Sequence, residues 1–248
     1  MALRIALLSD IHANREAMEA VLANAAARQA TGFVLLGDIV GYGPDPVWCV
    51  EKAMSLTAAG AAVVRGNHDQ AVGDPSISMN TVARTVIDWT ATVLGDDHKA
   101  FLSSLPLSAT AEDRLYVHAE ASAPARFHYV TDADAAAAHF AASEARLGFC
   151  GHVHRPALYA LGTGGKVTSF TPTRATAIPL LNQRRWLAVV GAVGQPRDGD
   201  PAAGYALLDT ETNELCFLKV PYDVDRTVAK IRAAGLPEAL AARLSRGA

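Results

Sequence analysis

The sequence is poor in the residue types that mark several common classes of protein. Cysteine occurs only three times, at Cys49, Cys150 and Cys216, with no CxxC pair. Widely spaced thiols of this kind are typical of reduced packing residues in a cytoplasmic protein, and the cytoplasm is therefore the predicted location. They also argue against a structural zinc site, because such sites are usually closed by cysteines.

Long apolar runs and excess positive charge are also missing. No apolar stretch approaches the roughly 20 residues that a membrane-spanning helix needs, so no membrane partner is expected. The run IALLS near the start lacks a cleavage-type site and is predicted to be a first strand rather than a signal peptide. Lysine and arginine number 22 against 25 acidic residues, which gives a net charge of −3. Because basic residues are not in excess, no nucleic-acid partner is expected.

What the chain does contain is a large supply of core residues, arranged in an alternating pattern. Half of its 248 residues are hydrophobic, enough for one sizeable α/β domain. Continuous apolar runs predict buried strands, and apolar residues at helical spacing predict helices between them. This βαβαβ alternation indicates a parallel sheet with crossover helices. The predicted elements in chain order are strand 4–9, helix 14–30, strand 32–38, helix 45–56 and strand 61–69.

The second half of the chain predicts a mixed sheet packed on the first. A helical segment is expected at about 74–105, a helix at 133–145, and strands at 114–120 and 147–154. Three further runs look like hairpin strands, with turns at 162–165 and 210–213. The tail is predicted to be helical, with a break at 235–237.

Five predicted strand ends carry residues that commonly bind metal ions. In an open α/β sheet, groups at the carboxyl ends of strands gather at one edge, so these side chains are expected to converge. Carboxylate, amide and imidazole ligands without thiolate suit Mn, Fe, Zn or Ni, and a carboxylate can bridge two cations. The residues are Asp10 with His12, Asp38, Asn67 with His68, His118, and His152 with His154.

Simpler interpretations of single residues remain open at this point. Asp10 could cap the following helix, and His118 on its own could be a core histidine with satisfied hydrogen bonds. His68 and Asp69 could be turn residues. The metal-site interpretation rests on the whole set, together with the alternation that would place His152 and His154 on one face of an extended segment.

The segments SDIHAN, GDIVGYGPDP, GNHD, VHA and GHVH, in this order, resemble the calcineurin-like metallophosphoesterase superfamily. VGQPRDGDPAAGYALLD and the alanine-rich tail are similar to its small bacterial and archaeal phosphodiesterase branch. The resemblance covers nearly the whole chain. It implies an α/β fold, specifically a four-layer αββα sandwich of two mixed sheets flanked by helices. The expected organisation is a single domain, 1–248, with the helical segment about 74–105 near the site and a helical tail about 223–248.

The resemblance also implies a role for each site residue. One metal ion would be held by Asp10, His12 and His154. A second would be held by Asn67, His118 and His152. Asp38 would bridge the two ions. His68 would contact the phosphate and protonate the leaving oxygen, with Asp69 orienting it. Substrate contacts would come from Asn67, His68 and Arg197, with Arg65 as a further positive group near the site.

The implied activity is that of a metal-dependent phosphoesterase, foremost a phosphodiesterase, on a small phosphoester substrate. A hydroxide bridging two divalent ions (Mn²⁺, Fe, Zn²⁺ or Ni²⁺) would attack phosphorus in line. The alternatives are a dinucleoside polyphosphate hydrolase, a phosphomonoesterase such as a protein phosphatase, and a non-catalytic protein-binding scaffold. The complete ligand set argues against a scaffold. Relatives often form dimers or larger assemblies, so a homo-oligomer is compatible with the resemblance.

The chain departs from many of these relatives in two places. Ala13 and Ala119 stand where many have glycine, and residues 189–198 read VVGAVGQPRD where many read NPGSVGQPRD. These departures concern the loops around the metals and on the substrate side, and they leave the ligand set intact.

Overall fold

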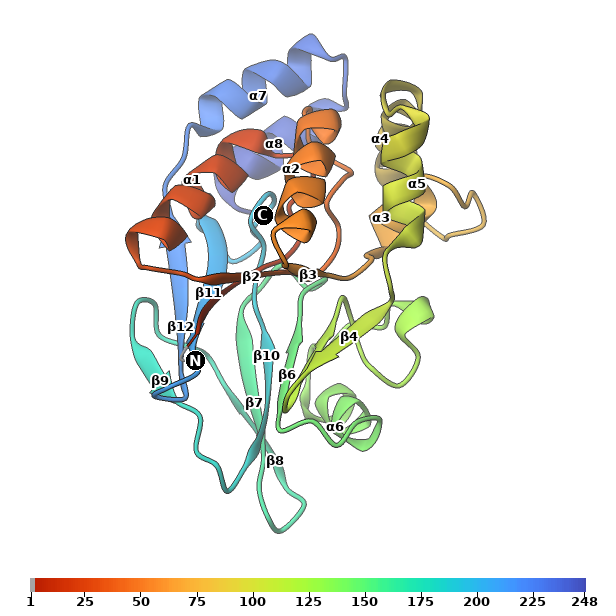
Figure 1. Ribbon diagram of the computed structural model, residues 1–248. Helices are drawn as coiled ribbons and strands as arrows, with labels where there is room; N and C mark the ends of the chain where they lie inside the picture. The colour runs from red at the N-terminus through yellow and green to blue at the C-terminus, as the bar shows by residue number, and fades with distance from the viewer. Residues whose placement is uncertain (1–2) are drawn as a thin grey trace.

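The computed structural model describes residues 3–248 as two mixed β-sheets packed face to face between helices (Figure 1). This confirms the predicted fold class. The first sheet has the order β3-β2-β1-β11-β12-β9, in which the first three strands are parallel and the others antiparallel. Its strands are β1 (Arg4–Leu8), β2 (Gly32–Leu35), β3 (Ala62–Val63), β9 (Ala177–Pro179), β11 (Ala203–Asp209) and β12 (Glu214–Val220).

The second sheet has the order β4-β5-β6-β10-β7-β8. Strands β5, β6 and β10 are parallel, and antiparallel strands flank them on both sides. Its strands are β4 (Ser108–Ala111), β5 (Arg114–Val117), β6 (Leu147–Cys150), β7 (Ala157–Leu161), β8 (Val167–Phe170) and β10 (Arg185–Val189).

Helices cover the outer faces of both sheets. Helices α1 (Arg15–Ala27) and α2 (Pro46–Ala58) pack on the first sheet, and α6 (Ala133–Ala141) packs on the second. The short α3 (Asn67–Ala71), α4 (Thr81–Val93) and α5 (Asp96–Ser104) lie together beside β3 and β4 (Figure 1). The chain ends in α7 (Val224–Ala233) and α8 (Glu238–Arg246), and a 3₁₀ turn spans Pro124–Arg126.

Strand β1 shows why the first apolar run is continuous. Ile5 and Leu7 pack into the core between the two sheets, whereas Ala6 and Leu8 pack into the core beneath the helices. Successive side chains of a strand point to opposite faces, so a strand that is buried on both faces needs apolar residues throughout.

A buried carboxylate of α1, that of Glu16, connects this helix to α7. The Glu16 carboxylate accepts from Lys230 Nζ at 2.6 Å, Arg226 Nε at 3.2 Å and Thr227 Oγ1 at 3.0 Å. Leucines of α8 then join an apolar cluster with α4 and with Tyr42. The C-terminal helices therefore support α4 and Tyr42, which lie beside the site described below.

Several boundaries differ from the prediction. Strand β3 has two residues, and Asn67 and His68 begin α3 instead of ending a strand. Residues 74–80 form turns before α4. Strand β10 is a central strand beside β6 rather than part of a hairpin, because its partners lie far away in the sequence. No helix among residues 3–248 is both long and apolar enough to cross a membrane.

Candidate metal centre

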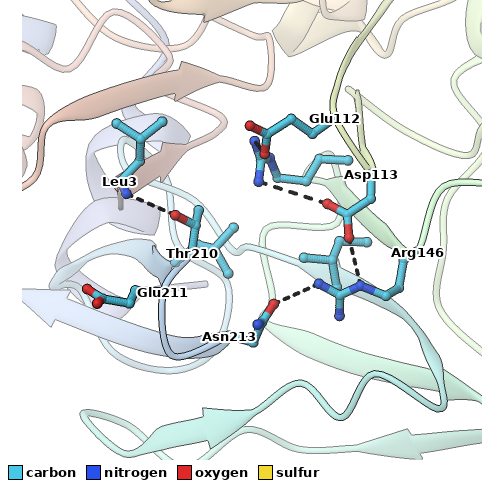
Figure 2. A pocket seen from close by; sticks show the side chains of 10 residues that line it. Leu3, Glu112, Asp113, Arg146, Thr210, Glu211 and Asn213 are labelled. Atoms are coloured by element: carbon cyan, nitrogen blue, oxygen red, sulfur yellow. Dashed lines mark hydrogen bonds and ion pairs between the residues drawn. The ribbon is translucent and has the colours of Figure 1, made fainter. Parts of the chain in front are cut away.

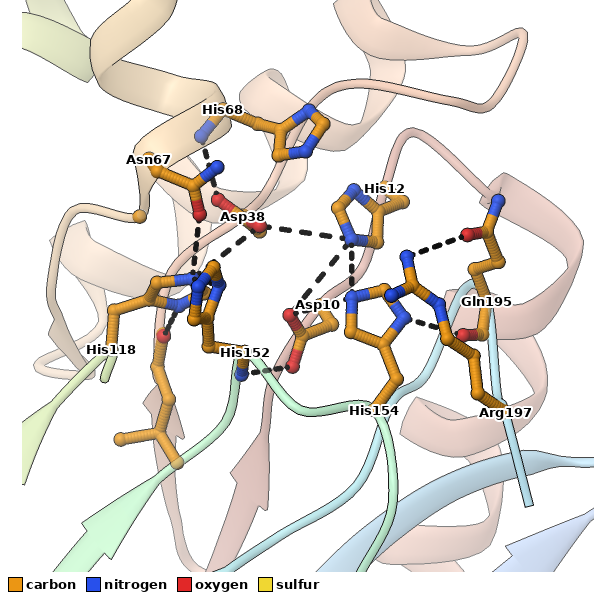
Figure 3. Close-up of polar contacts among 12 residues, drawn as sticks. Asp10, His12, Asp38, Asn67, His68, His118, His152, His154, Gln195 and Arg197 are labelled. Carbon is orange, nitrogen blue, oxygen red and sulfur yellow. Dashed lines mark hydrogen bonds and ion pairs between the residues drawn. The ribbon is translucent and has the colours of Figure 1, made fainter. Parts of the chain in front are cut away.

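The predicted ligand residues meet at the carboxyl ends of the central strands (Figure 3). Asp10 follows β1, Asp38 follows β2 and His118 follows β5, while His152 comes two residues after β6. Because the two sheets pack face to face, loops from both reach the same space. The structure brings together the seven predicted ligands: Asp10, His12, Asp38, Asn67, His118, His152 and His154.

The backbone around this site adopts unusual conformations. Five of the seven ligand residues have positive φ, at 52° for Asp10, 49° for His12, 53° for Asp38, 65° for His152 and 62° for His154. Left-handed backbone costs L-residues roughly 1–2 kcal/mol, and such strain gathers at functional sites. The prediction that His152 and His154 lie on an extended segment is therefore wrong. Tight turns, not strand alternation, direct both rings into the site.

Each carboxylate has one oxygen fixed by a backbone N–H and the other directed at the histidines. His152 N donates to Asp10 Oδ2 at 2.9 Å, and His68 N donates to Asp38 Oδ1 at 2.8 Å. Asp10 Oδ1 is buried and makes no hydrogen bond within the described chain. It lies 3.2 Å from His154 Nε2 and 3.8 Å from His12 Nε2. These three residues form one candidate metal position.

The second candidate position lies on the other side of Asp38. His118 Nε2 is 3.1 Å from His152 Nδ1, 3.2 Å from Asn67 Oδ1 and 3.4 Å from Asp38 Oδ2. The same Asp38 oxygen is 3.7 Å from His12 Nε2. Asp38 Oδ2 therefore faces both positions, where a bridging carboxylate belongs.

Backbone carbonyls orient three of the imidazoles. The Nδ1 atom of His12 lies 3.2 Å from the Val40 carbonyl, that of His118 lies 2.7 Å from Leu36 and that of His154 lies 2.6 Å from Gln195. A proton held on Nδ1 by a carbonyl leaves the Nε2 lone pair available to a metal ion. Two of these Nε2 atoms, in His12 and His154, are 3.1 Å apart, a contact suited to two nitrogens that share a cation.

Burial sets the electrostatics of this cluster. It lowers the pKa of His152 to about 3, with His118 adding to the effect. Burial also disfavours charge on His118, but the neighbouring Asp38 carboxylate outweighs it and raises the pKa to about 9. For Asp38 itself, burial favours the neutral acid, yet His118 and His68 hold its pKa well below the usual range. His12, His68 and His152 therefore stay neutral beside ionised carboxylates, whereas His118 must release a proton when a divalent cation binds, because such cations bind deprotonated ligands.

Three overlapping groups in the described chain have ligand atoms within 4.8 Å of one another. They are Asp10–His12–His154, Asp38–His118–His152 and His12–Asp38–His68. The donor set contains carboxylates, an amide and imidazoles but no thiolate, so it fits divalent transition metals. The third group shows that His68 lies beside the metal positions.

Comparison with known proteins agrees with this geometry. A family model for the calcineurin-like phosphoesterase superfamily domain matches residues 3–213. The chain belongs to this superfamily. A crystal structure of a metallophosphoesterase from Sphaerobacter thermophilus has a TM-score of 0.88 and 38% identity, with both chains covered completely. Membership of this superfamily implies a phosphoester hydrolase, and its members typically bind divalent metals.

Two further relatives resemble this calcineurin-like chain over almost its full length. An uncharacterized protein of Methanocaldococcus jannaschii is 34% identical over 249 residues, which is 98% of each chain. A hypothetical protein of Pyrococcus horikoshii shares the fold, with a TM-score of 0.78, 20% identity and coverage of 99% of this chain and 98% of that one.

His68 occupies a tight position next to the candidate metal ligands. Its ring centroid lies 4.8 Å from that of His12 and 4.5 Å from that of Tyr42. Gly41 makes room for it, because a Cβ at that position would lie 2.2 Å from His68 Nδ1. Within residues 3–248 this Nδ1 has no hydrogen-bond partner.

Asp69 has a different role from the one predicted. Its Oδ1 accepts from Ile39 N at 2.8 Å and Val40 N at 3.2 Å, and its Oδ2 accepts from Gly66 N at 2.9 Å. The carboxylate therefore ties the Asp38 loop to the start of α3 and makes no hydrogen bond to the His68 ring. Burial, together with Asp38, raises the pKa of Asp69 to about 7.

A cavity of about 120 Å³ opens onto the metal positions. Arg197, a predicted substrate contact, lines this cavity and donates to Gln195 Oε1 at 3.1 Å. Arg65 does not line the cavity and donates instead to the Ser103 carbonyl. The loop 189–198 also fixes the site, because Gln195 holds His154. Sequence reasoning missed six lining residues: Tyr42, Ser78, Met79, Asn80, Ala83 and Tyr129. Only Tyr42 had a signal, its place within GDIVGYGPDP.

A larger cavity, of about 430 Å³, lies at the amino ends of β5 and β6 (Figure 2). Both of its arginines are already paired: Arg146 contacts Asp113 at 2.7 Å and Asn213 Oδ1 at 2.7 Å, and Arg114 contacts Glu112. It has no imidazole among its lining residues. Size alone therefore does not locate the chemistry of this fold.

Proposed function

We propose that this chain is a binuclear metallophosphoesterase that acts foremost as a phosphodiesterase on a small substrate. One observation carries the proposal: the Nε2 atoms of His12, His118 and His154 point into one space shared with Asp10 and Asp38, while backbone carbonyls occupy their Nδ1 atoms. Such an arrangement leaves buried polar groups without partners unless a cation joins them.

The proposed ligands of the first metal ion are Asp10, His12 and His154, and those of the second are Asn67, His118 and His152. Asp38 is the proposed bridge. When bound, two divalent cations would lower the pKa of a water molecule and stabilise negative charge on a phosphoryl group. The identity of the ions among Mn²⁺, Fe, Zn²⁺ and Ni²⁺ is left to elemental analysis.

The protein residues around the metals would position the substrate. Asn67 and the His68 ring face the cavity, where His68 can donate a hydrogen bond to a phosphoryl oxygen and a proton to the leaving oxygen. The Arg197 guanidinium lies 5.9 Å from the Tyr42 ring centroid, which holds it over the cavity. A guanidinium with only an amide partner is suited to a phosphate oxygen.

The charge of the cavity favours a diester. Among the lining residues in the described chain, Arg197 is the only lysine or arginine. A diester carries one negative charge, whereas a monoester or a polyphosphate chain carries more and needs more cations to balance it. A dinucleoside polyphosphate or a phosphomonoester is therefore the second choice, and a non-catalytic scaffold the third.

The experiment is hydrolysis of bis-p-nitrophenyl phosphate and p-nitrophenyl phosphate by protein loaded with Mn²⁺. We expect the diester to have the higher kcat/KM, and EDTA to abolish the reaction. Arg197→Ala should raise KM about tenfold, with Arg232→Ala, a surface arginine paired with Glu238, as the matched control. Activity that persists in EDTA would contradict the metal mechanism, and inactivity of the metal-loaded protein on both esters would favour a scaffold.

We further propose that the chain acts as one domain in the cytoplasm. The reasons are the three free cysteines, which are typical of a reducing compartment, and the apolar core that the two sheets share. Cysteine-specific labelling under native and denaturing conditions in unreduced extracts would check the redox state.

A further inference from the structure

An exposed tyrosine beside the candidate metal centre has no role in the mechanism proposed above. The Tyr129 residue is 54% exposed, although it lines the same cavity as His68 and Arg197. It lies between β5 and α6, in the loop that begins with the proposed ligand His118. Of the four large hydrophobic side chains that are exposed among the described residues, Tyr129 is the only one that lines this cavity.

The loop holds Tyr129 firmly in this position. Its neighbours Phe127 and Val130 are buried, with 8% and 2% exposure, and Glu120 N donates to the His128 carbonyl at 3.0 Å. Phe127 packs its ring edge-on against His118, with centroids 5.9 Å apart. The residues on either side of Tyr129 are thus fixed by packing and hydrogen bonding, and they hold its side chain at the cavity.

One face of the Tyr129 ring is already stacked. It lies parallel to the His152 imidazole, with centroids 4.1 Å apart and planes inclined by 12°. Its exposure of 54% leaves much of the side chain open. A fixed, half-open aromatic ring is the usual surface on which another flat ring stacks.

The size of the cavity explains what would reach this ring. About 120 Å³ is well below the roughly 300–1,000 Å³ of pockets that enclose a whole drug-sized ligand. A phosphate held by the metals would therefore leave its ester substituent outside, along the rim formed by Tyr129, Ser78 and Asn80. Ser78 and Asn80 are exposed polar residues that can meet the edge of a heterocyclic ring.

We propose that Tyr129 is a stacking platform that selects phosphoesters carrying a flat ring, of the nucleotide type, next to the reacting phosphate. This inference rests on the proposed function and names the substrate class for the same site. Tyr129 is then a specificity-determining residue, and the ring rather than the hydroxyl carries the effect.

The test compares two ligands of which one carries a nucleobase and the other does not. Adenosine 5′-monophosphate and ribose 5-phosphate are titrated calorimetrically into Mn²⁺-loaded protein, and the ratio of their Kd values is taken. Base–aromatic stacking of about 1–3 kcal/mol corresponds to a preference for the nucleotide of about 5- to 150-fold. Tyr129→Ala should reduce the ratio to below about twofold, while Tyr129→Phe should keep it.

Two controls separate this platform from a purely structural cover of His152. Phe170→Ala removes another exposed aromatic, 43% exposed on β8, and should leave the ratio unchanged. Metal content of Tyr129→Ala should equal that of the parent protein. Loss of metal in that variant, a parent ratio near one, or a ratio unchanged by Tyr129→Ala would overturn the platform. Hydrolysis of bis-p-nitrophenyl phosphate, measured in parallel, reports the proposed function separately.

Discussion

Asp69 offers a sharp test of how this site is assembled, because its carboxylate supports the loop that carries Asp38. Three backbone N–H groups, from Ile39, Val40 and Gly66, donate to it in a position that is 2% exposed. Asp69→Ala would leave all three donors buried without a partner. Each such donor costs about 1–3 kcal/mol, so we expect a loss of about 3–9 kcal/mol in the free energy of unfolding.

Asp69→Asn separates the parts of this effect. The amide oxygen can keep the two bonds that Oδ1 accepts, but the amide NH₂ group cannot accept from Gly66 N. One lost bond predicts a cost of about 1–2 kcal/mol. The matched control is Asp209→Ala, since Asp209 Oδ1 also accepts from two backbone N–H groups, of Glu211 and Thr212, in a turn that water reaches. We expect that control to lose about 1 kcal/mol.

The assay is urea unfolding of the metal-free proteins in EDTA at pH 8, above the pKa of about 7 that burial and Asp38 impose on Asp69. Removing the metal ensures that the measured loss comes from loop support alone. Metal content of each variant is then measured after reconstitution, and Asp69→Ala should bind less. Equal destabilisation by Asp69→Ala and Asp209→Ala would refute the reasoning.

Four other substitutions test the site and the packing of α6. His68→Ala should keep both metals yet lower kcat by about 10²–10⁴, whereas Asp38→Ala should lose metal; equal metal loss in both, by elemental analysis, contradicts the separation of roles. Gly66→Ala should also lose metal, since its Cβ would lie 2.2 Å from Asp38 Oδ1. His139 has a pKa lowered to about 4 by burial in α6, against about 6.5 unfolded, so its stabilising effect is complete above pH 6.5 and is lost as pH falls towards 4. Between pH 8 and pH 5, His139→Leu should therefore lose about 2 kcal/mol less unfolding free energy than the parent protein, and identical losses would show that His139 does not titrate as described.

The strand-and-helix pattern was predictable where one physical rule dominates. Continuous apolar runs located β1, β2 and β6, and Asn14 marked the start of α1, where its Oδ1 accepts from Ala17 N. The convergence of the ligand residues was predictable as well, because carboxyl ends of parallel strands share an edge. Strands β4 and β9 were missed because both are short, and β4 is largely exposed, so their sequences show no strong alternation.

Other features of the site depend on tertiary structure that no local pattern encodes. Asp69 is the third residue of α3, and its bond from Gly66 N is a local helix cap, but its two other backbone partners, Ile39 and Val40, come from a loop that is distant in the sequence. Tyr129 lies in a stretch without periodicity, and only the packing of Phe127 and Val130 places it over His152. His152 and His154 have the spacing of an extended segment but adopt left-handed turns, since His152 N must reach Asp10.

The central claim is that seven side chains hold two cations, and anomalous diffraction from crystals soaked in Mn²⁺ tests it most directly. The account predicts two peaks about 3.5–4 Å apart. One peak should lie among Asp10, His12 and His154, and the other among Asn67, His118 and His152, with Asp38 touching both. A single peak, or two peaks that do not share Asp38, would contradict the account.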